Sequence, residues 1–481
     1  MATFHALRGD ITCLSALTGL RRWVVYAPRR SRGRNYTIER DNRFSGGKMA
    51  THSESHRRDS SHGRRDLRQV PGYVPWFIGD SFTEFGRAIS VITVPLLALA
   101  VTGSPMMAGI IQGVVTLAAL LVRVPAGMVV DTVDRRKIVY LMTSLAAVSY
   151  GALALGLEVG LVNTASLIPL LVFAGIALAI SNAAVNAILK SILPPQLFPY
   201  ASSLEEGRDA AASLAGAPVG GFLFAFSQSI PFALTALGNI VTIVSIKLIP
   251  QDLHPTRDES EKRSKLEPQG EQVGRLAGML VGFKIVWGIA ALPTLILAVT
   301  VGNLGFSGLF TTIVFSWQER GVVYALIGGL GTATGIGVII GSFFAGSVAS
   351  KIRAYPIATT ALTLSSIGAL GVSFSTGSVI LTLAAFAVVV FPFPFLNAVL
   401  GAYSVASIPN KYQGRAGAAA GLLGSAAAPL GPALAGVGVE FLGQFGAALA
   451  FAGFLAAGAI ICWASPALRR VAAATEWGDE A

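Results

Sequence analysis

Twelve long apolar runs, separated by short polar segments, constrain this chain more than any other feature of its sequence. They cover about 74–101, 106–130, 137–157, 164–189, 208–227, 230–249, 286–316, 322–349, 355–374, 378–403, 414–440 and 444–466. A run of roughly 20 apolar residues can cross ~30 Å of hydrocarbon as an α-helix. The sequence therefore predicts an all-α membrane protein with twelve transmembrane helices.

The composition agrees with a chain whose solvent is mostly lipid. Of the 481 residues, 53% are apolar and only 13% are charged, whereas a soluble domain carries about 25% charge. The 54 glycines are expected where helices pack closely without water to drive them together. The net charge of +11 lies mostly in the segment 8–68 and in loops, so it does not indicate nucleic-acid binding.

Polar segments divide the chain into five parts. Residues 1–72 are Arg-rich and irregular, which predicts a basic, disordered cytoplasmic tail, with contact to anionic lipid as the alternative role. Two six-helix bundles are expected at 73–249 and 286–466, joined by a cytoplasmic central loop at 250–285 and followed by a cytoplasmic tail at 467–481.

The end of the central loop is itself apolar. Residues 274–287 carry Arg275 and Lys284 set apart along the stretch. This pattern predicts an amphipathic helix on the cytoplasmic surface of the membrane. The alternative is that these residues simply continue the seventh span.

Loop charge predicts the orientation of the spans. The basic residues on one side are Arg135, Arg136, Lys137, Lys190, Lys351, Arg353, Lys411, Arg415, Arg469 and Arg470, whereas the opposite loops hold only Arg320. Cytoplasmic loops carry an excess of Lys and Arg. We therefore expect both termini in the cytoplasm and a multi-pass protein of the cell membrane, the inner or plasma membrane of a bacterium.

Two sequence patterns occur once in each half. NAAVNAILKSILP at 182–194 corresponds to NAVLGAYSVASIP at 397–409, a shift of 215 residues. GMVVDTVDRR at 127–136 corresponds to the segment that starts at Gly346, a shift of 219, with Ser350 in place of the acid. Two patterns at nearly equal shifts indicate an internal repeat of six spans.

The chain resembles the major facilitator superfamily. The resemblance rests on twelve spans, a central loop, and the motif formed by Gly127, Asp131, Arg135 and Arg136 after the second span. It covers about 73–466 and implies two six-helix halves that move about a central site.

Two further patterns suggest a branch of that superfamily. Gly216, Pro218, Gly220 and Gly221 are similar to the helix-packing antiporter signature of span five, although Ala217 replaces an expected glycine. Gly79-Asp80, Val94-Pro95-Leu96 and residues 102–105 are similar to the macrolide-efflux and enterobactin-exporter group of drug:proton antiporters. An arginine typical of span four in other branches is absent from this chain.

The motif after span two predicts a cytoplasmic gate. Gly127 would let another helix approach closely, and Asp131 would accept hydrogen bonds from free amides at a helix N-terminus. The resemblance implies that this partner is the start of span eleven, near Gly414 and Arg415. Arg135 and Arg136 would pair with acids or lipid phosphates; the alternative is that they only orient the protein.

Three charged residues share one face of span one. Asp80, Glu84 and Arg87 are spaced by four and three residues, and Glu84 lies roughly 15 Å into the membrane. Carboxylates at such depth face a cavity or a partner and can exchange protons near neutral pH. We take Glu84 as the first candidate for proton coupling and Asp80 as the second. The alternative is that Arg87 merely neutralises Glu84.

Other polar residues within the spans are candidates for lining a substrate cavity. They are Arg123, Asn182, Asn186, Asn303 and Asn397. Amides near the bilayer midplane suit a bulky, partly apolar ligand. Interhelical hydrogen bonding is the alternative for each asparagine, and for Arg123 it is a pair with Asp80.

No catalytic constellation, metal site or cofactor motif is present in the sequence, so we expect no enzyme. We expect a monomeric secondary transporter that works by alternating access within the lipid bilayer. Its partners would be protons and a small-molecule substrate, a hydrophobic or amphipathic, drug- or macrolide-like molecule that is exported, with no nucleic acid. The alternatives are a siderophore or lipid-like metabolite exporter, and a non-transporting sensor or channel.

Overall fold

Helices account for almost all of the chain that the computed structural model describes, residues 67–253, 275–375 and 377–471. These residues belong to one compact unit, Arg57–Ala481. The predicted tail up to residue 66, residues 254–274 of the central loop and the tail from residue 472 lie outside the described residues. Leu67 is already buried, so the described fold begins ahead of the predicted boundary at 72.

The helices of the first half follow one another with short connections. They are α2 (Tyr73–Thr102), α3 (Pro105–Val130), α4 (Arg135–Glu158), α5 (Thr164–Ile192), α6 (Phe198–Phe226) and α7 (Ile230–Lys247). Several begin at a residue that satisfies the free amides of the first turn. Ser104 accepts from Met107, and Asn163 forms a reciprocal capping box with Ser166.

The second half contains more, and shorter, helices. They are α9 (Arg275–Gly288), α10 (Leu292–Glu319), α11 (Tyr324–Lys351), α12 (Ala354–Phe374), α13 (Val379–Val390), α14 (Phe393–Ser407), α15 (Gln413–Ser425), α16 (Leu430–Ala464) and α17 (Pro466–Arg469). Two spans that the sequence predicts as continuous are each divided, at Phe391–Pro392 and at 426–429. Proline explains both breaks, because its ring removes an amide donor and clashes with the preceding turn.

Eleven ranges among the described residues are long and apolar enough to cross a membrane. One of them, Gln413–Ala464, has 52 residues, more than twice the number that a ~30 Å hydrocarbon core requires. Gly443 within it has φ 65° and ψ −179°, which is not helical, and the chain reverses there, because a Cβ on Gly438 would meet Ala447. Divided at Gly443, the described residues contain the twelve spans that the sequence predicts.

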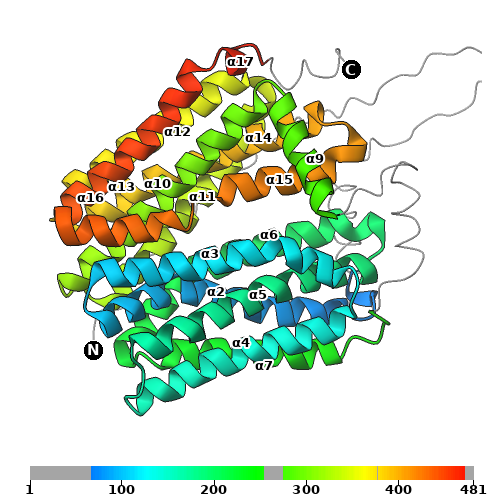
Figure 1. The fold of residues 1–481 in the computed structure, drawn as a ribbon, viewed down its shortest axis with the longest axis vertical. Coiled ribbons are helices and arrows are strands. Elements are labelled where there is room, and N and C mark those ends of the chain that lie inside the picture. The colour runs from blue at the N-terminus through cyan, green and yellow to red at the C-terminus, as the bar shows by residue number, and fades with distance from the viewer. Residues whose placement is uncertain (1–66, 254–274, 376, 472–481) are drawn as a thin grey trace, which may run out of the picture. The chain divides into compact units, whose positions relative to one another are not determined.

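The two halves form separate bundles that meet along a few helices (Figure 1). Within the first half, α2 packs on α6 and α7, and α4 on α5 and α7; within the second, α16 packs on α10 and α12. Across the halves, α6 packs on α11 and α3 packs on α16. A smaller contact between α2 and α10 also joins the halves.

The helix ends define two faces. The basic face carries the connections at 131–134, 193–197, 352–353 and 408–412, and the opposite face carries those at 103–104, 159–163, 227–229, 320–323 and 375–378. The basic loop residues of the sequence analysis gather at the basic face. Arg320 lies at the opposite face.

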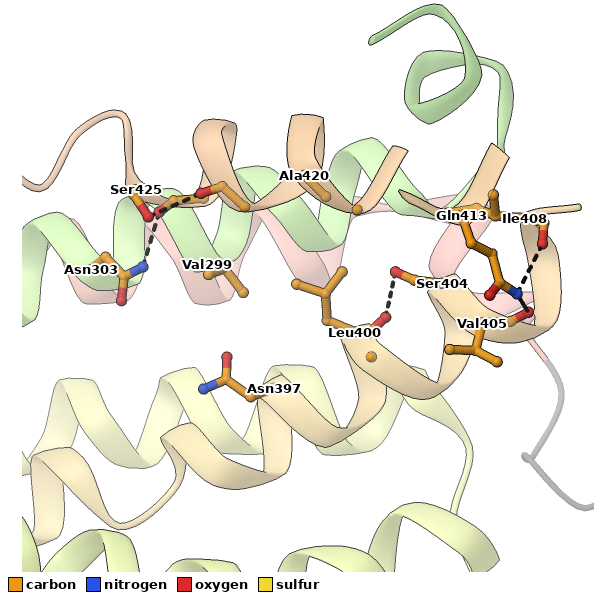
Figure 2. Close-up of a pocket in the computed structure, with 14 residues that line it drawn as sticks. Val299, Asn303, Asn397, Leu400, Ser404, Val405, Ile408, Gln413, Ala420 and Ser425 are labelled. Carbon is orange, nitrogen blue, oxygen red and sulfur yellow. Dashed lines mark hydrogen bonds between the residues drawn. The ribbon is translucent and has the colours of Figure 1, made fainter. Parts of the chain in front are cut away.

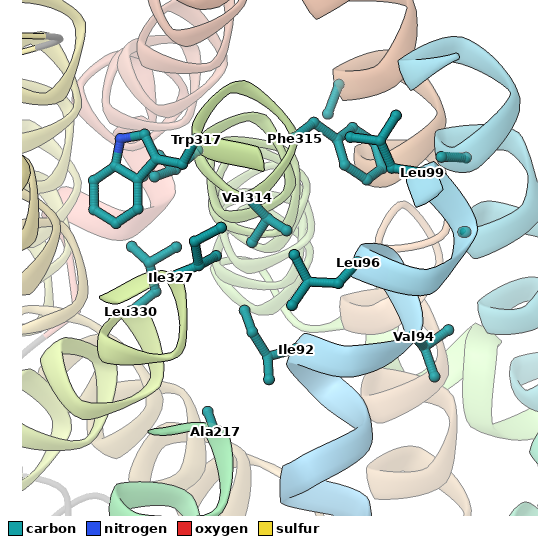
Figure 3. Packing of buried hydrophobic residues seen from close by; sticks show 14 of the residues in the cluster. Ile92, Val94, Leu96, Leu99, Ala217, Val314, Phe315, Trp317, Ile327 and Leu330 are labelled. Carbon is teal, nitrogen blue, oxygen red and sulfur yellow. The ribbon is translucent and has the colours of Figure 1, made fainter. Parts of the chain in front are cut away.

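The apolar core is shared by both halves only toward the opposite face. One cluster there joins α2 and α6 of the first half to α10 and α11 of the second, with Ile92, Leu96 and Ala217 near Val314 and Ile327 (Figure 3). Toward the basic face, one cluster contains residues of the first half alone and two contain residues of the second half alone.

Glycines show the same difference along the helices that join the halves. Near the opposite face, an added Cβ would overlap backbone of the other half at Gly109, Gly221, Gly328 and Gly436. Near the basic face of the same spans, no heavy atom lies within 4 Å of a Cβ built on Gly127, Gly207, Gly346 or Gly421. The halves are therefore in backbone contact at the opposite face and separated at these positions on the basic face.

Candidate functional site

A cavity of about 520 Å³ lies in the second half, between α10, α14 and α15 (Figure 2). It is lined by Val299, Asn303, Asn397, Leu400, Gly401, Ser404, Val405, Ile408, Gln413, Gly417, Ala420, Gly421, Gly424 and Ser425. None of these lining residues carries a charge. The walls are aliphatic, with a few amides and hydroxyls placed along them.

Most polar groups of this cavity are held by the backbone. Asn303 Nδ2 donates to the Gly424 carbonyl oxygen at 2.9 Å, which ties α10 to α15, and Ser404 Oγ donates to the Leu400 oxygen at 2.6 Å. The Asn397 amide has no hydrogen bond to any described residue and lies beside the open space (Figure 2). Asn397 is therefore the polar group best placed to bind a ligand.

The cavity brings together two of the five predicted lining residues, Asn303 and Asn397. The other three belong to the first half and are exposed there. Asn186 Nδ2 donates to Asn182 Oδ1 at 2.9 Å along α5, and Arg123 lies on α3. The alternative pairing of Arg123 with Asp80 is wrong, because a different arginine occupies that carboxylate.

The arginine that binds Asp80 is Arg208 of α6. Its Nη1 lies 2.5 Å from Asp80 Oδ2, and its Nη2 lies 2.8 Å from Asp209 Oδ1. The side chains of Asp80 and Arg208 are only 9% and 12% exposed, whereas that of Asp209 is 47% exposed. The guanidinium also lies over the Phe77 ring, 5.5 Å from its centroid. One cation is thus shared between a buried and a half-exposed carboxylate.

Glu84 forms a second pair one turn away from Asp80 on α2. Arg87 Nη2 lies 2.6 Å from Glu84 Oε2, and the Arg87 side chain is 53% exposed while that of Glu84 is 8% exposed. The alternative in which Arg87 neutralises Glu84 therefore matches the geometry.

Sequence reasoning missed Arg208 because it placed the start of span five at residue 208. In the structure α6 begins ten residues earlier, at Phe198, with proline in its first turn. Glu205 and Asp209 are then four residues apart on one helix, a spacing that the sequence already contained. A proline followed by acids at helical spacing was the available signal.

The predicted gate motif lies at the end of α3 and the start of α4. Asp134 caps α4 by accepting from the Arg136 amide, and the Arg136 side chain donates to the carbonyl oxygens of Ile249 and Gln251 at 2.6 and 2.9 Å. Arg136 thereby binds the chain just after α7, within its own half, and Arg135 is buried nearby. In this conformation Gly127 has no neighbour in the position where its missing side chain would be.

The predicted packing motif of span five touches two helices. A Cβ at Gly216 or Gly220 would meet α2, at Ala88 and Ile89 respectively, and one at Gly221 would overlap the Tyr324 carbonyl oxygen of α11. Pro218 lies beside Gly328 of the same α11. The motif therefore packs α6 against α2 of its own half and against α11 of the other half.

No group of three or more His, Cys, Asp or Glu residues that could hold a metal ion occurs among the described residues.

Comparisons with known proteins agree with this architecture. The profile of the Major Facilitator Superfamily matches residues 76–320. Similar solved structures include the nucleoside transporter NupG, with 14% identity and a TM-score of 0.60 over 83% of this chain and 99% of that chain. A POT family transporter in complex with 5-aminolevulinic acid has 11% identity and a TM-score of 0.63 over 82% and 96%.

At these identities the likeness to solved structures establishes the fold alone. No match was found among curated protein sequences. The family profile covers just over half of the chain, and its match includes the first half, α9 and α10. The chain therefore belongs to the Major Facilitator Superfamily, a family of membrane transporters rather than enzymes.

Proposed function

We propose that this protein is a secondary active transporter that works by alternating access, and that its conformation here is open to the cytoplasm. Loop charge assigns the basic face to the cytoplasm. We further propose that it exports hydrophobic or amphipathic small molecules, drug- or macrolide-like, in exchange for protons. The motifs similar to the macrolide-efflux and enterobactin-exporter group support export.

The observation that carries this proposal is the unequal packing of the two faces. One apolar cluster spans both halves toward the opposite face, whereas the clusters toward the basic face each stay within one half. A central site in such an arrangement is reachable from the basic face only. Alternating access requires a second conformation in which the halves are packed together at the basic face and separated at the opposite face.

The cavity of the second half supports the substrate class. Its walls include Val299, Leu400 and Val405, and its hydrogen-bonding groups include the free amide of Asn397. Ligand sites of this kind bury apolar surface and use a few polar groups for orientation. An uncharged lining suits a molecule whose bulk is apolar and whose polar groups are few.

The pair of Asp80 and Arg208 supports coupling to protons. When Asp80 binds a proton, it no longer neutralises Arg208, but Asp209 Oδ1 already lies 2.8 Å from the same guanidinium. The cation therefore keeps a partner in both protonation states of Asp80. Glu84, the first candidate from the sequence, therefore ranks second here, because Arg87 pairs with it within one helix and this pair joins no second helix.

Transport by purified protein in vesicles tests the proposal. We expect uptake of an amphipathic fluorescent drug to depend on an imposed pH gradient. We expect Asp80→Asn to abolish this dependence and Glu84→Gln to retain it. Movement of the drug that ignores the pH gradient in the unmodified protein would contradict antiport. Unchanged dependence in Asp80→Asn would move the coupling step to another residue.

A further inference from the structure

We propose that Glu440 is a latch that holds the opposite face shut, and that it is the counterpart of Asp131 in the gate motif at the basic face. The inference rests on the alternating access proposed above. It concerns the contact between α3 and α16, which belong to different halves.

The Glu440 carboxylate binds the start of α3. Its Oε2 accepts from Ser104 Oγ at 2.7 Å and from the Met106 amide at 3.0 Å. Ser104 caps α3, and Met106 lies in its first turn, where backbone amides have no partner within the helix. The acid of one half thus satisfies the free helix terminus of the other.

Charge makes this contact stronger than an ordinary surface hydrogen bond. A helix N-terminus carries a partial positive charge that favours a carboxylate, and a bond to an ionised acceptor is shorter and stronger than a neutral one. Both donors approach the same oxygen atom, so the contact requires a defined position of α3 relative to α16. Rotation of the halves away from each other would break both bonds together.

A glycine one turn earlier makes the contact reachable. A Cβ at Gly436 would overlap the carbonyl oxygen of Pro105, and one at Gly109 would overlap the carbonyl oxygen of Pro432. The backbones of α3 and α16 therefore touch directly beneath the carboxylate. Gly436 and Glu440 are four residues apart, so they lie on the same side of α16.

The same spacing occurs in the gate motif. Gly127 and Asp131 are also four residues apart and end α3 at the basic face, just as Gly436 and Glu440 precede the break of α16 at Gly443. For Asp131 the resemblance implies a helix N-terminus of the other half, near Gly414. With that partner the two latches would be reciprocal, because each glycine-x-x-x-acid sequence ends one of the two partnered spans and would cap the beginning of the other.

The two glycines differ in what surrounds them, as reciprocal latches require. Gly436 is in backbone contact with α3, whereas a Cβ at Gly127 or at Gly414 would have no heavy atom within 4 Å. The close approach is thus made at the Glu440 end and not at the Asp131 end. The internal repeat places the second copy of the gate motif at Gly346 instead, where Ser350 replaces the acid.

Cysteine labelling of the full-length protein in lipid nanodiscs tests the latch without substrate or gradient. Ala433 lies against Gly113 across the closed face, and Gly421 lines the cavity of the second half. In a background that carries Cys13→Ser and Cys462→Ala, Ala433→Cys reports opening of the opposite face. Gly421→Cys reports opening of the basic face.

We expect Glu440→Ala to raise the maleimide labelling rate at Ala433→Cys about tenfold and to lower it at Gly421→Cys, because two charge-assisted bonds are lost. Glu440→Gln keeps an acceptor oxygen without the charge and should raise the rate about threefold. Glu158→Gln is the matched control, because Glu158 is an exposed acid at the same face whose carboxylate accepts from Ser227 and Ser229 of its own half, and it should leave both rates unchanged.

Gly436→Leu distinguishes failure of the latch from failure of alternating access. Its side chain would force α3 and α16 apart and open the opposite face. If this variant raises labelling at Ala433→Cys while both Glu440 variants do not, the latch is overturned and alternating access stands. If Gly436→Leu also leaves both labelling rates unchanged, alternating access is overturned and the latch with it.

Discussion

Glycines lie at both ends of the helices that join the halves, but their surroundings differ between the two ends. Toward the opposite face, glycines of α3, α6, α11 and α16 bring backbones of different halves into contact; toward the basic face, glycines of the same spans have open space around them. Small residues let membrane helices approach closely. Both ends are therefore built for contact, and the difference between them is one of conformation and not of composition.

The largest test of this comparison replaces one glycine at each end of α3. We expect Gly109→Leu and Gly127→Leu each to lower transport by ~100-fold or more. The added side chain keeps one face from closing, so nearly all of the protein is held in a single conformation. Cysteine labelling should show that Gly109→Leu is trapped open to the opposite face and Gly127→Leu open to the basic face. Trapping in the same conformation would contradict the comparison.

A second test asks how strongly α2 and α6 are joined inside the first half. The Arg208 side chain joins α2 to α6 inside that half. We expect Arg208→Gln to lower the free energy of unfolding by about 2 kcal/mol, because it leaves Asp80 buried without its cation.

Asp209→Asn is the matched control, since Asp209 is half-exposed and its loss leaves the pair of Asp80 and Arg208 in place. It should cost less than ~1 kcal/mol. Chemical unfolding in detergent measures both variants. Equal losses in the free energy of unfolding would show that the ion pair between α2 and α6 stabilises the protein no more than the control interaction does.

A third test compares the halves as ligand sites. We expect Asn397→Leu to raise KM about tenfold with kcat unchanged, because its amide would bind the substrate equally in the ground and transition states. Asn186→Leu, which removes an amide already bonded to Asn182 in the first half, should change KM less than ~twofold. Initial rates of drug uptake in vesicles measure both. A larger effect at Asn186 would place the substrate against the first half.

The smallest expected effect concerns the gate motif itself. Asp131→Asn should lower transport about threefold, because an amide accepts from a helix terminus more weakly than a carboxylate does. Ser350→Ala, at the corresponding position of the second copy, should leave transport unchanged. Transport rates in the same vesicles measure both variants. Equal rates would contradict the expected difference between the two copies of the motif.

The number and order of the spans could be predicted from sequence because hydropathy is a local property. Breaks within spans could not be located in this way, since the runs through Phe391–Pro392 and 426–429 remain apolar and long. The start of α6 was misplaced for a related reason. Its first turns carry Glu205 and Arg208, and charged residues lower hydropathy whether they lie in a loop or are neutralised inside a bundle.

For the candidate site too, the residue types could be predicted from the sequence but their partners in space could not. Asn303 and Asn397 could be singled out as polar residues in apolar runs, but their meeting in one cavity depends on how α10 and α14 pack. The bond between Asp80 and Arg208 joins residues 128 positions apart. That partnership is a property of the packing of α2 on α6, which no local pattern records.

The bond between Asp80 and Arg208 also has a consequence for biogenesis. The range that contains α6 has the lowest mean hydropathy of the eleven candidate spans, and charged residues near a helix centre oppose insertion from the translocon. Asp80 enters the membrane first, because α2 is synthesised before α6. We therefore expect α2 to act as an intramolecular chaperone for α6, with Asp80→Ala lowering the inserted fraction of α6 in a glycosylation-tag assay.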